Sequence, residues 1–270
     1  MGFLTDSDFK DLTDFTGHYY GIDLRRKRSM VEGRLRAYIV HEGYENFSTY
    51  FREVLHDRSG VEAEKLINRL STNYTYFMRE EKHFDYFRDT ILPDLLVREK
   101  SKDLRIWSAG CSSGEEAYTL AMILADYFGN NKSFWDTCIL ATDISTRALQ
   151  IASQAIYEPD QLNKIPPNWR MRFFEPIEDG RSRVVKALRD EVIFRKFNLM
   201  EKTFPFRKQM HVIFCRNVMI YFDNKTKNEV VNRFYDILQP GGYLLVSLSE
   251  SISRDVSRFK YVMPSVYRKE

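Results

Sequence analysis

A glycine-bounded turn is the first feature of the sequence that has the residue types of a ligand site. Gly110-Cys-Ser-Ser-Gly114 follows the apolar run Leu104–Ala109 and precedes a helical stretch that opens with Glu115-Glu116. Glycines in such a turn let the backbone approach a ligand at the carboxyl end of a strand. The spacing differs from a dinucleotide fingerprint, and the two acids would repel a pyrophosphate. S-adenosylmethionine, with an amino group, a sulfonium and no phosphate, would tolerate them. The alternative is a plain helix N-terminus whose acids favour the helix dipole.

Asp143 follows a second strand-like run, in Ala141-Thr-Asp-Ile144. A carboxylate at the end of the second strand can accept hydrogen bonds from both ribose hydroxyls of a nucleoside. The alternative is that Asp143 caps the helix predicted to start near Ser145.

Two further segments carry polar and aromatic residues at places where a substrate could bind. In the first, Phe214-Cys-Arg-Asn-Val-Met-Ile-Tyr-Phe222, Arg216 and Asn217 follow a strand, and Tyr221 could reach a reaction centre unless it is a core aromatic. In the second, Asn73-Tyr-Thr-Tyr-Phe-Met-Arg-Glu80, Arg79 could orient a carboxylate through a bidentate contact. By composition alone the second segment is a linker.

The elements that must position these residues are of two kinds. Up to about residue 100, apolar residues recur at helical spacing, and the sequence predicts five helices. We expect them over about 5–17, 23–41, 47–59, around 66–70 and from 80 into the 90s, where Pro93 kinks or divides the last one.

Strand-like and helical runs alternate after Lys102, which predicts an α/β domain with a mostly parallel sheet. Strands are expected at 104–109, 138–142, 211–215 and 243–247, helices at 115–128, 147–156 and 225–238, and a terminal hairpin at 259–268. The turn-rich segment 157–196 interrupts this rhythm. Its short runs at 183–186 and 192–195 predict a small antiparallel β insertion.

Composition limits the possible partners and location. The chain of 270 residues has a net charge of only +3, which disfavours a general polyanion binder, although 25–36 holds six basic residues and one acid. Its three cysteines, without a CxxC pair, argue against a disulfide framework or a metal site. With no signal peptide and no membrane-spanning apolar run, we expect a cytoplasmic protein.

Together, these segments resemble the chemotaxis receptor methyltransferases of the CheR family. The matching residues are Asn73–Arg79, Gly110–Glu116, Ala141–Asp143, Phe197–Leu199 and Cys215–Phe222. The resemblance covers nearly the whole chain, and the Cys215–Phe222 string is its most specific part.

The resemblance implies an all-α N-terminal domain (1–72), a linker and connecting helix (73–102), and a Rossmann-like methyltransferase domain (103–270) with a β subdomain inserted at 157–196. S-adenosylmethionine is the implied methyl donor, and glutamates on the cytoplasmic helical bundle of transmembrane chemoreceptors are the implied acceptors. The implied cofactor-binding residues are Asn73, Thr75, Arg79, Gly110, Glu115, Asp143, Asn198, Leu199, Arg216 and Asn217. Arg79 and Tyr221 would lie nearest the methyl group and the acceptor carboxylate.

The resemblance also gives the basic helix a role, because Arg25, Arg28 and Arg36 would dock on the acidic receptor bundle; the alternative is a solvated helix surface. We expect a monomer that is recruited to membrane receptor arrays and binds no nucleic acid. A glutamate carboxylate is ionised near pH 7 and needs no general base. The short loop at 175–182, with one glycine, predicts that no receptor C-terminal peptide is needed as a tether. The alternatives are a methyltransferase of the same fold with another acceptor and a non-catalytic binding module.

Overall fold

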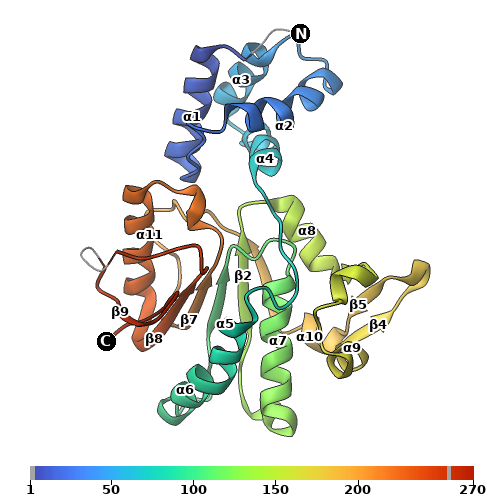
Figure 1. Ribbon diagram of the computed structural model, residues 1–270, viewed down its shortest axis with the longest axis vertical. Coiled ribbons are helices and arrows are strands. Elements are labelled where there is room, and N and C mark those ends of the chain that lie inside the picture. Colours follow the sequence, from blue (N-terminus) through green and yellow to red (C-terminus); the bar gives the residue numbers. More distant parts are fainter. Residues whose placement is uncertain (1–3, 254–256) are drawn as a thin grey trace.

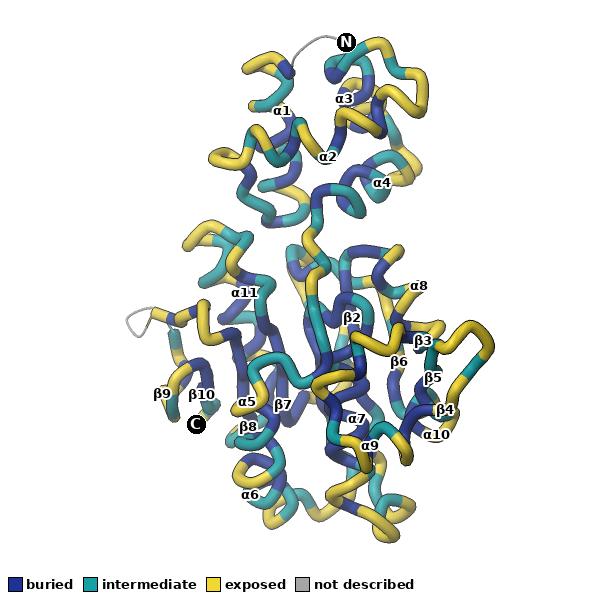
Figure 2. Tube along the Cα trace, turned by 45° about the vertical axis from the view of Figure 1, so that its right-hand side comes forward, coloured by how far each residue is buried: buried dark blue, intermediate teal, exposed yellow. Residues whose placement is uncertain are grey.

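The computed structural model describes residues 4–253 and 257–270 as two lobes joined by an extended linker (Figure 1). The smaller lobe is all helical. It comprises α1 (Asp6–Tyr20), α2 (Arg28–His41), α3 (Phe47–His56) and α4 (Val61–Leu70). These helices enclose a core of their own, which includes Leu12, Leu35, Tyr50 and Leu66 and is separate from the core around the sheet (Figure 2). The predicted all-α N-terminal domain is therefore confirmed.

The second helix begins later than the sequence predicted. The Asp23 side chain accepts the Arg25 backbone N–H at 3.1 Å, and Lys27 N–H donates to the Leu24 carbonyl at 2.8 Å. These bonds hold 23–27 in turns, because an Asp side chain competes well for nearby backbone donors. Arg25 thus lies outside the helix, which begins at Arg28.

The connecting helix is continuous but irregular. It consists of α5 (Glu81–Tyr86), a π-helical turn η1 (Phe87–Ile91) and α6 (Leu92–Arg98). Pro93 lies in the first turn of α6, where its missing N–H is tolerated. The π-helical turn η1 lies directly before α6 and divides the regular α-helix there. Single π-helical turns inside α-helices are the form in which π-helix is mostly found.

The main sheet has seven strands in the order β6-β2-β1-β7-β8-β10-β9. The strands are β1 (Ile106–Ala109), β2 (Ile139–Asp143), β6 (Val192–Lys196), β7 (Met210–Cys215), β8 (Leu238–Val246), β9 (Lys260–Met263) and β10 (Val266–Arg268). The first five run parallel to one another, and β10 runs antiparallel to both β8 and β9. The expected α/β fold and terminal hairpin are both present.

Helices cover both faces of this sheet, as Figure 1 shows. Besides α5, η1 and α6, they are α7 (Glu115–Phe128), α8 (Thr146–Gln154), α10 (Lys186–Arg189) and α11 (Asn224–Ile237). Short 3-10 turns lie in the connections, namely η2 (Gly129–Phe134), η3 (Pro159–Leu162), η4 (Glu178–Gly180) and η5 (Met219–Tyr221). One core packs α5, η1, α6 and α7 against the sheet. The other gathers Phe204, Phe206 and Phe234 around Trp107.

The inserted sheet is smaller than predicted. It contains β3 (Ile156–Tyr157), β4 (Phe174–Pro176) and β5 (Ser182–Val184) in the antiparallel order β3-β5-β4, beside α9 (Pro167–Phe173). The run at 192–195 was wrongly assigned to it. That run belongs to β6, the edge strand of the main sheet, where it pairs in parallel with β2. The sequence of a short strand in a turn-rich segment does not indicate which of two sheets the strand joins.

Polar contacts fix the N-terminal lobe on the sheet domain. Asn68 Oδ1 accepts from Ser145 Oγ at 2.8 Å, and Glu64 Oε1 accepts from Thr146 Oγ1 at 2.6 Å. Glu64 also pairs with Lys196 at the end of β6. These contacts place α4 against the start of α8. None of the helices in the described ranges is long and apolar enough to cross a membrane.

Candidate active site

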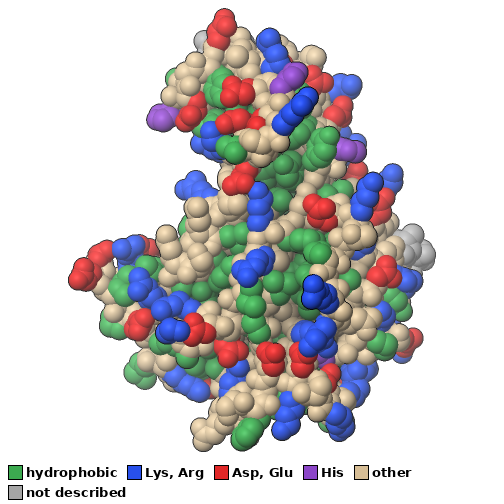
Figure 3. Space-filling view, turned by 180° about the vertical axis from the view of Figure 1, so that it is seen from behind, with side chains coloured by type: hydrophobic (Ala, Val, Ile, Leu, Met, Phe, Trp, Pro, Cys, Tyr) green, Lys and Arg blue, Asp and Glu red, His purple; other side chains and the backbone are tan. Residues whose placement is uncertain are grey.

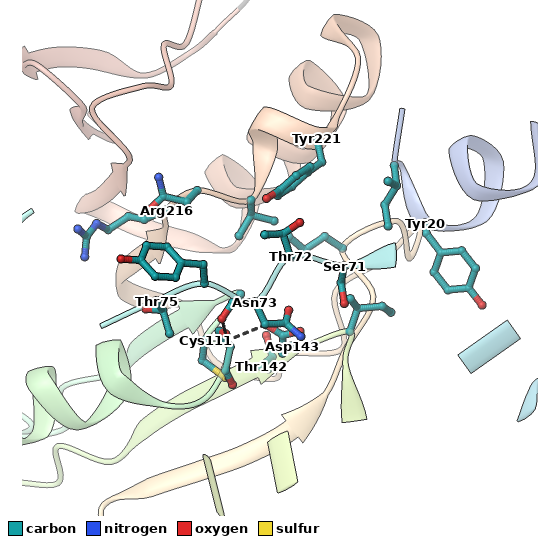
Figure 4. Close-up of a pocket in the computed structure, with 18 of the residues that line it drawn as sticks. Tyr20, Ser71, Thr72, Asn73, Thr75, Cys111, Thr142, Asp143, Arg216 and Tyr221 are labelled. Atoms are coloured by element: carbon teal, nitrogen blue, oxygen red, sulfur yellow. Dashed lines mark hydrogen bonds between the residues drawn. The ribbon is translucent and has the colours of Figure 1, made fainter. Parts of the chain in front are cut away.

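A cavity of about 200 Å³ lies at the carboxyl ends of the parallel strands, beneath the N-terminal lobe. Its wall contains residues from six segments together with Phe84 and Glu116. The segments are 20–30, the linker 70–79, 110–112, 142–144, 197–199 and 216–222. Figure 4 shows residues of these segments converging on one space. Every motif that the sequence indicated therefore contributes to a single site.

Gly110 forms the tightest part of the wall. Its φ is +106°, and a Cβ built there would lie 2.2 Å from Val218 Cγ2. No larger residue fits at this position without moving the loop that follows β7. The glycine turn is therefore packed directly against the Arg216–Phe222 segment, which brings two of the motifs together.

Asp143 ends β2 and lines the cavity, with 9% of its surface exposed. One carboxylate oxygen accepts from Ser112 N–H and the other from Ser145 N–H, both at 2.8 Å. Burial raises the pKa of Asp143. The residue that caps α8 is Ser145, whose hydroxyl accepts from Ala148 N–H. The helix-cap alternative for Asp143 is therefore wrong, and its carboxylate belongs to the cavity wall.

The two acids at the start of α7 differ in position. The Glu115 carboxylate is buried away from the cavity wall and accepts from Ser113 Oγ at 2.7 Å; burial raises its pKa. Glu116 lines the cavity instead, and its carboxylate accepts from Ser108 Oγ at 2.7 Å. The acid that faces the cavity is thus Glu116, not the predicted Glu115. Sequence spacing alone does not tell which of two adjacent helical residues faces the turn.

Arg216 is held by carboxylates on both sides. Its side chain is 2% exposed, and it donates to Glu116 Oε2 and to Glu80 Oε2, each at 3.1 Å. Arg216 also donates to the Arg79 carbonyl, and its guanidinium lies 5.0 Å from the centre of the Phe84 ring. Arg216 therefore ties the linker and α7 to the loop after β7.

Glu80 is a residue of this site that the sequence did not indicate. Its second oxygen accepts from Ser247 Oγ at 2.8 Å. Burial would raise the pKa of Glu80, but hydrogen bonds from His83 and Ser247 and the charge of Arg216 outweigh burial and lower the pKa to about 2. In the sequence, the only indication that Glu80 belongs to the site is that it directly follows Arg79.

Glu250 was missed as well, although it shapes the loop that carries Asn217 and Tyr221. Its buried carboxylate accepts backbone N–H groups from Asn217 at 3.0 Å, Ile220 at 3.1 Å and Ser247 at 2.8 Å. Asn217 has a left-handed φ of +59°, and its side-chain amide donates to Ser247 Oγ at 2.7 Å. Asn217 lines the cavity while its side chain holds the loop after β8.

The linker and the loop after β6 supply the other predicted residues. Asn73 accepts from Ser112 Oγ through its carbonyl at 2.9 Å, and its amide donates to Ser145 Oγ at 3.2 Å. Asn198 donates to the Tyr19 carbonyl at 2.7 Å, which joins the sheet domain to α1. Thr75 and Leu199 line the cavity beside them.

Arg79 and Tyr221 both line the cavity, and neither is committed to a carboxylate. Arg79 Nη1 donates to the Tyr74 carbonyl at 2.7 Å, and among the described residues the guanidinium has no carboxylate partner. Tyr221 accepts a backbone hydrogen bond from Asp23 N–H at 2.8 Å, and Lys27 Nζ lies 5.2 Å from the centre of its ring. Figure 4 shows the Tyr221 side chain at the upper side of the cavity.

The roof of the cavity belongs to the N-terminal lobe, which sequence reasoning had not placed in the site. The contributing residues are Tyr20, Ile22, Leu24, Lys27 and Met30. The space-filling view from behind shows hydrophobic side chains gathered where the two lobes meet (Figure 3). No local motif reveals this contact, because it depends on how the lobes pack.

The predicted docking arginines do not line the cavity. Arg25 pairs with Asp23 at 2.7 Å, and Arg28 pairs with Asp6 and, at 3.4 Å, with Glu32. Arg36 is exposed, and within the described part of the chain it forms no ion pair. Since Arg25 precedes α2, only Arg28 and Arg36 share a face of that helix.

The cavity fits an adenosyl ligand without phosphates. Asp143 offers carboxylate acceptors at the end of β2, and Gly110 leaves room for close approach. Glu116 places an acid where a phosphate would be repelled and an amino group tolerated. The parallel sheet with its cavity at the carboxyl edge thus defines an S-adenosylmethionine-dependent methyltransferase.

Two family models match the chain. One, described as the CheR methyltransferase SAM binding domain, matches residues 73–267, and one described as the CheR methyltransferase all-alpha domain matches residues 7–71. The chain therefore belongs to the CheR family and is a chemotaxis protein methyltransferase that uses S-adenosylmethionine as methyl donor.

Curated relatives agree along the full length. The chain is 39% identical to the "Chemotaxis protein methyltransferase" of Borreliella burgdorferi, over 98% of this chain and 95% of that protein. It is 35% identical to the protein of that name from Escherichia coli, over 98% of this chain and 91% of the relative. A solved putative rRNA methylase from Clostridium thermocellum has a TM-score of 0.36 at 15% identity, over 64% of this chain and 73% of that one, too slight a likeness to support any functional inference.

Proposed function

We propose that this enzyme transfers the methyl group of S-adenosylmethionine to glutamate side chains on the cytoplasmic helical bundle of chemoreceptors. The products are glutamyl methyl esters and S-adenosylhomocysteine. The observation that carries the proposal is the Arg79 guanidinium, which lines the cavity and has no carboxylate partner in 4–253 and 257–270. A free arginine at this position suits an anionic acceptor, because it can bind a carboxylate through two parallel hydrogen bonds.

The chemistry requires positioning more than proton transfer. When bound, S-adenosylmethionine supplies a methyl group whose bond to the sulfonium sulfur breaks as the acceptor oxygen attacks, so the electron pair remains on sulfur. The acceptor carboxylate is ionised near pH 7, since a free glutamate has a pKa of about 4.3. Arg79 orients this carboxylate, and the Tyr221 hydroxyl donates to its second oxygen. The N-terminal lobe excludes water from above.

Arg216 does not compete with Arg79 for the acceptor. Its two terminal nitrogens already donate to Glu80, Glu116 and the Arg79 carbonyl. Arg216 therefore fixes the linker that carries Arg79. Because Arg216 is already paired, the acceptor carboxylate binds to Arg79, in line with the methyl group.

Arg25, Arg28 and Arg36 are the proposed docking residues for the acidic receptor bundle, with the enzyme acting as a monomer beside the membrane receptor arrays. Arg36 supports this role best, because it is exposed and makes no internal ion pair among the described residues. Asp23 and Asp6 partly neutralise Arg25 and Arg28. The basic surface formed by the three arginines therefore favours an acidic protein over a nucleic acid.

Incubation with radiolabelled S-adenosylmethionine, receptor-bearing membranes and total RNA tests the proposal. Base-labile label on the receptor is expected, and label on RNA, or cofactor binding without transfer, would contradict it. Arg79→Lys keeps the charge but removes the bidentate geometry, so transfer should fall by about 100-fold. Arg58→Lys, on an exposed turn of the N-terminal lobe, is the matched control and should transfer at the wild-type rate.

A further inference from the structure

The end of α1 and the turn that follows it reach from the N-terminal lobe into the cavity wall. Tyr20, Ile22 and Leu24 line the cavity, although all three belong to the helical lobe. Leu24 is only 1% exposed, so this part of the lobe is packed inward and does not lie open to water. Residues 20–24 are called the roof segment below.

Gly21 lets the roof segment lie close to the sheet domain. Its φ is +72°, and a Cβ built there would lie 2.7 Å from Met200 Sδ and 3.1 Å from both Phe222 Cε1 and Thr226 Cγ2. These three side chains come from the loop after β6, the loop after β7 and α11. A side chain at Gly21 would have to displace them, and glycine is the residue that adopts a left-handed backbone without strain.

Hydrogen bonds fix the roof segment on both sides. Within the N-terminal lobe, Ile22 N–H donates to the Thr16 carbonyl at 3.1 Å, and the Thr16 hydroxyl donates to the Ile22 carbonyl at 3.2 Å. Across the interface between the lobes, Asp23 N–H donates to the Tyr221 carbonyl at 2.8 Å. The roof segment is therefore tied both to α1 and to the loop after β7.

The roof segment lies at the end of the cavity that suits the adenosine half of the cofactor. In Figure 4, Arg216 lies at one side of the cavity and Tyr20 at the other, with Asp143 between them. A carboxylate at the end of the second strand is where a ribose binds in such folds, so the adenine belongs on the side of Asp143 away from Arg216. On that side, Asn198 lines the cavity and donates to the Tyr19 carbonyl at 2.7 Å.

We propose that the roof segment binds the adenosine half of S-adenosylmethionine, and that Gly21 is the positioning residue that seats the segment there. Ile22 and Leu24 remove apolar surface of the adenosine from water. The contact that closes the cavity also docks the lobe, so cofactor binding and lobe docking stabilise each other. The proposal concerns the cofactor and holds whichever acceptor receives the methyl group.

Calorimetry with S-adenosylhomocysteine tests the role of Gly21. Gly21→Ala should raise the Kd about tenfold, since the roof segment must move away from Met200 to admit the new Cβ. Gly43→Ala is the matched control. The φ of Gly43 is +79°, so the backbone strain is similar, but a Cβ there meets nothing within 4 Å among the described residues. A wild-type Kd in Gly21→Ala, or an equal rise in Gly43→Ala, would overturn the proposal.

Steady-state kinetics separate a roof for the cofactor from a roof for the acceptor. At saturating S-adenosylmethionine, Gly21→Ala should keep KM for a receptor cytoplasmic fragment within about twofold of wild type, while KM for the cofactor rises. A raised KM for the receptor fragment together with a wild-type cofactor Kd would mean that the roof segment serves the acceptor, and would overturn the proposal.

Hydrogen exchange on the unaltered enzyme keeps the test valid if Gly21→Ala folds poorly. S-adenosylhomocysteine should slow exchange of the Ile22 and Asp23 amides by roughly tenfold, because their hydrogen bonds hold the roof segment in place. The Tyr44 amide, which donates to the Ile39 carbonyl at 3.0 Å within the lobe, is the control and should not change. Unchanged exchange at Ile22 and Asp23 would contradict the proposal. Calorimetry and hydrogen exchange use no acceptor, so their outcome is independent of whether a glutamate is methylated.

Discussion

Arg216 donates to Glu80 Oε2 at 3.1 Å, and this contact joins the loop after β7 to the linker from the N-terminal lobe. Arg216 lines the cavity, and the pair is largely buried, with the Arg216 side chain 2% exposed and that of Glu80 16% exposed. Because both groups are largely removed from water, each depends on the other for its charge to be tolerated. The site is therefore assembled by a structural ion pair that does not itself bind the acceptor.

Glu80→Gln tests this pair. The substitution leaves Arg216 with Glu116 as its only carboxylate partner among the described residues, so the free energy of unfolding should fall by about 3 kcal/mol. Urea denaturation measures the change, and Glu81→Gln, at the exposed neighbouring position, is the control. A Glu80→Gln protein as stable as the control would mean that the pair contributes nothing to assembly.

Stability should fall with acidity in two pH windows. Burial lowers the pKa of His211, whose Nδ1 accepts from Arg105 N–H at 2.9 Å and whose Nε2 lies 2.9 Å from Glu99. Since the folded pKa lies below the unfolded value of 6.5, its contribution is complete above pH 6.5 and declines as the pH falls below it. The pKa of Glu80 is lowered to about 2 from 4.5, so its contribution is lost as the pH falls from 4.5 towards 2.

Denaturant titrations between pH 8 and about pH 2 check these windows. His211→Asn should flatten the decline just below pH 6.5, whereas His41→Asn, at a side chain that is 84% exposed, should not. If both variants keep the wild-type slope, His211 does not control the first window.

Gly110→Ala should impair cofactor binding. The added Cβ would lie 2.2 Å from Val218 Cγ2, and the φ of +106° strains any side chain. We expect the cofactor Kd to rise more than tenfold by calorimetry. The second change Val218→Ala should recover part of the loss, because it relieves the clash but not the backbone strain. Gly33→Ala, where a Cβ meets nothing within 4 Å, should bind normally.

Arg34 and Arg36 lie on the same helix but should act on different steps. Arg34 donates to the carbonyls of Leu70 at 2.6 Å and Ser71 at 3.1 Å, which anchors the linker. Arg34→Ala should therefore weaken cofactor binding about fivefold and lower the melting temperature. Arg36→Ala should raise only KM for the receptor, and this effect should diminish with added salt. Identical phenotypes would show that the two roles are not separate.

Local sequence predicted the parts of the site that each depend on one strand and the residue after it. Gly110 and Arg216 follow β1 and β7, Asp143 ends β2, and the rule that parallel strands end at one edge brings them together. The two-lobe α plus α/β fold was predicted for the same reason, because helical and strand periodicities are local.

The parts that were missed depend on long-range packing. The assignment of β6 to the main sheet follows from its pairing with β2, and the roof over the cavity follows from the docking of α4 on α8. Glu116 replaced Glu115 because the rotation of α7 decides which acid faces the ligand. Glu80 and Glu250 belong to no motif, and their roles come only from the loops they join.

Methylation of a carboxylate is tested most directly with two acceptors of the same shape, glutamate and glutamine. Purified enzyme is incubated with labelled S-adenosylmethionine and a receptor fragment that carries glutamate, or glutamine, at the mapped acceptor position. We expect a base-labile methyl ester on the glutamate fragment and none on the glutamine fragment, since only the carboxylate can pair with Arg79 and attack without a base. Equal labelling of both fragments, or base-stable label on either, would contradict it.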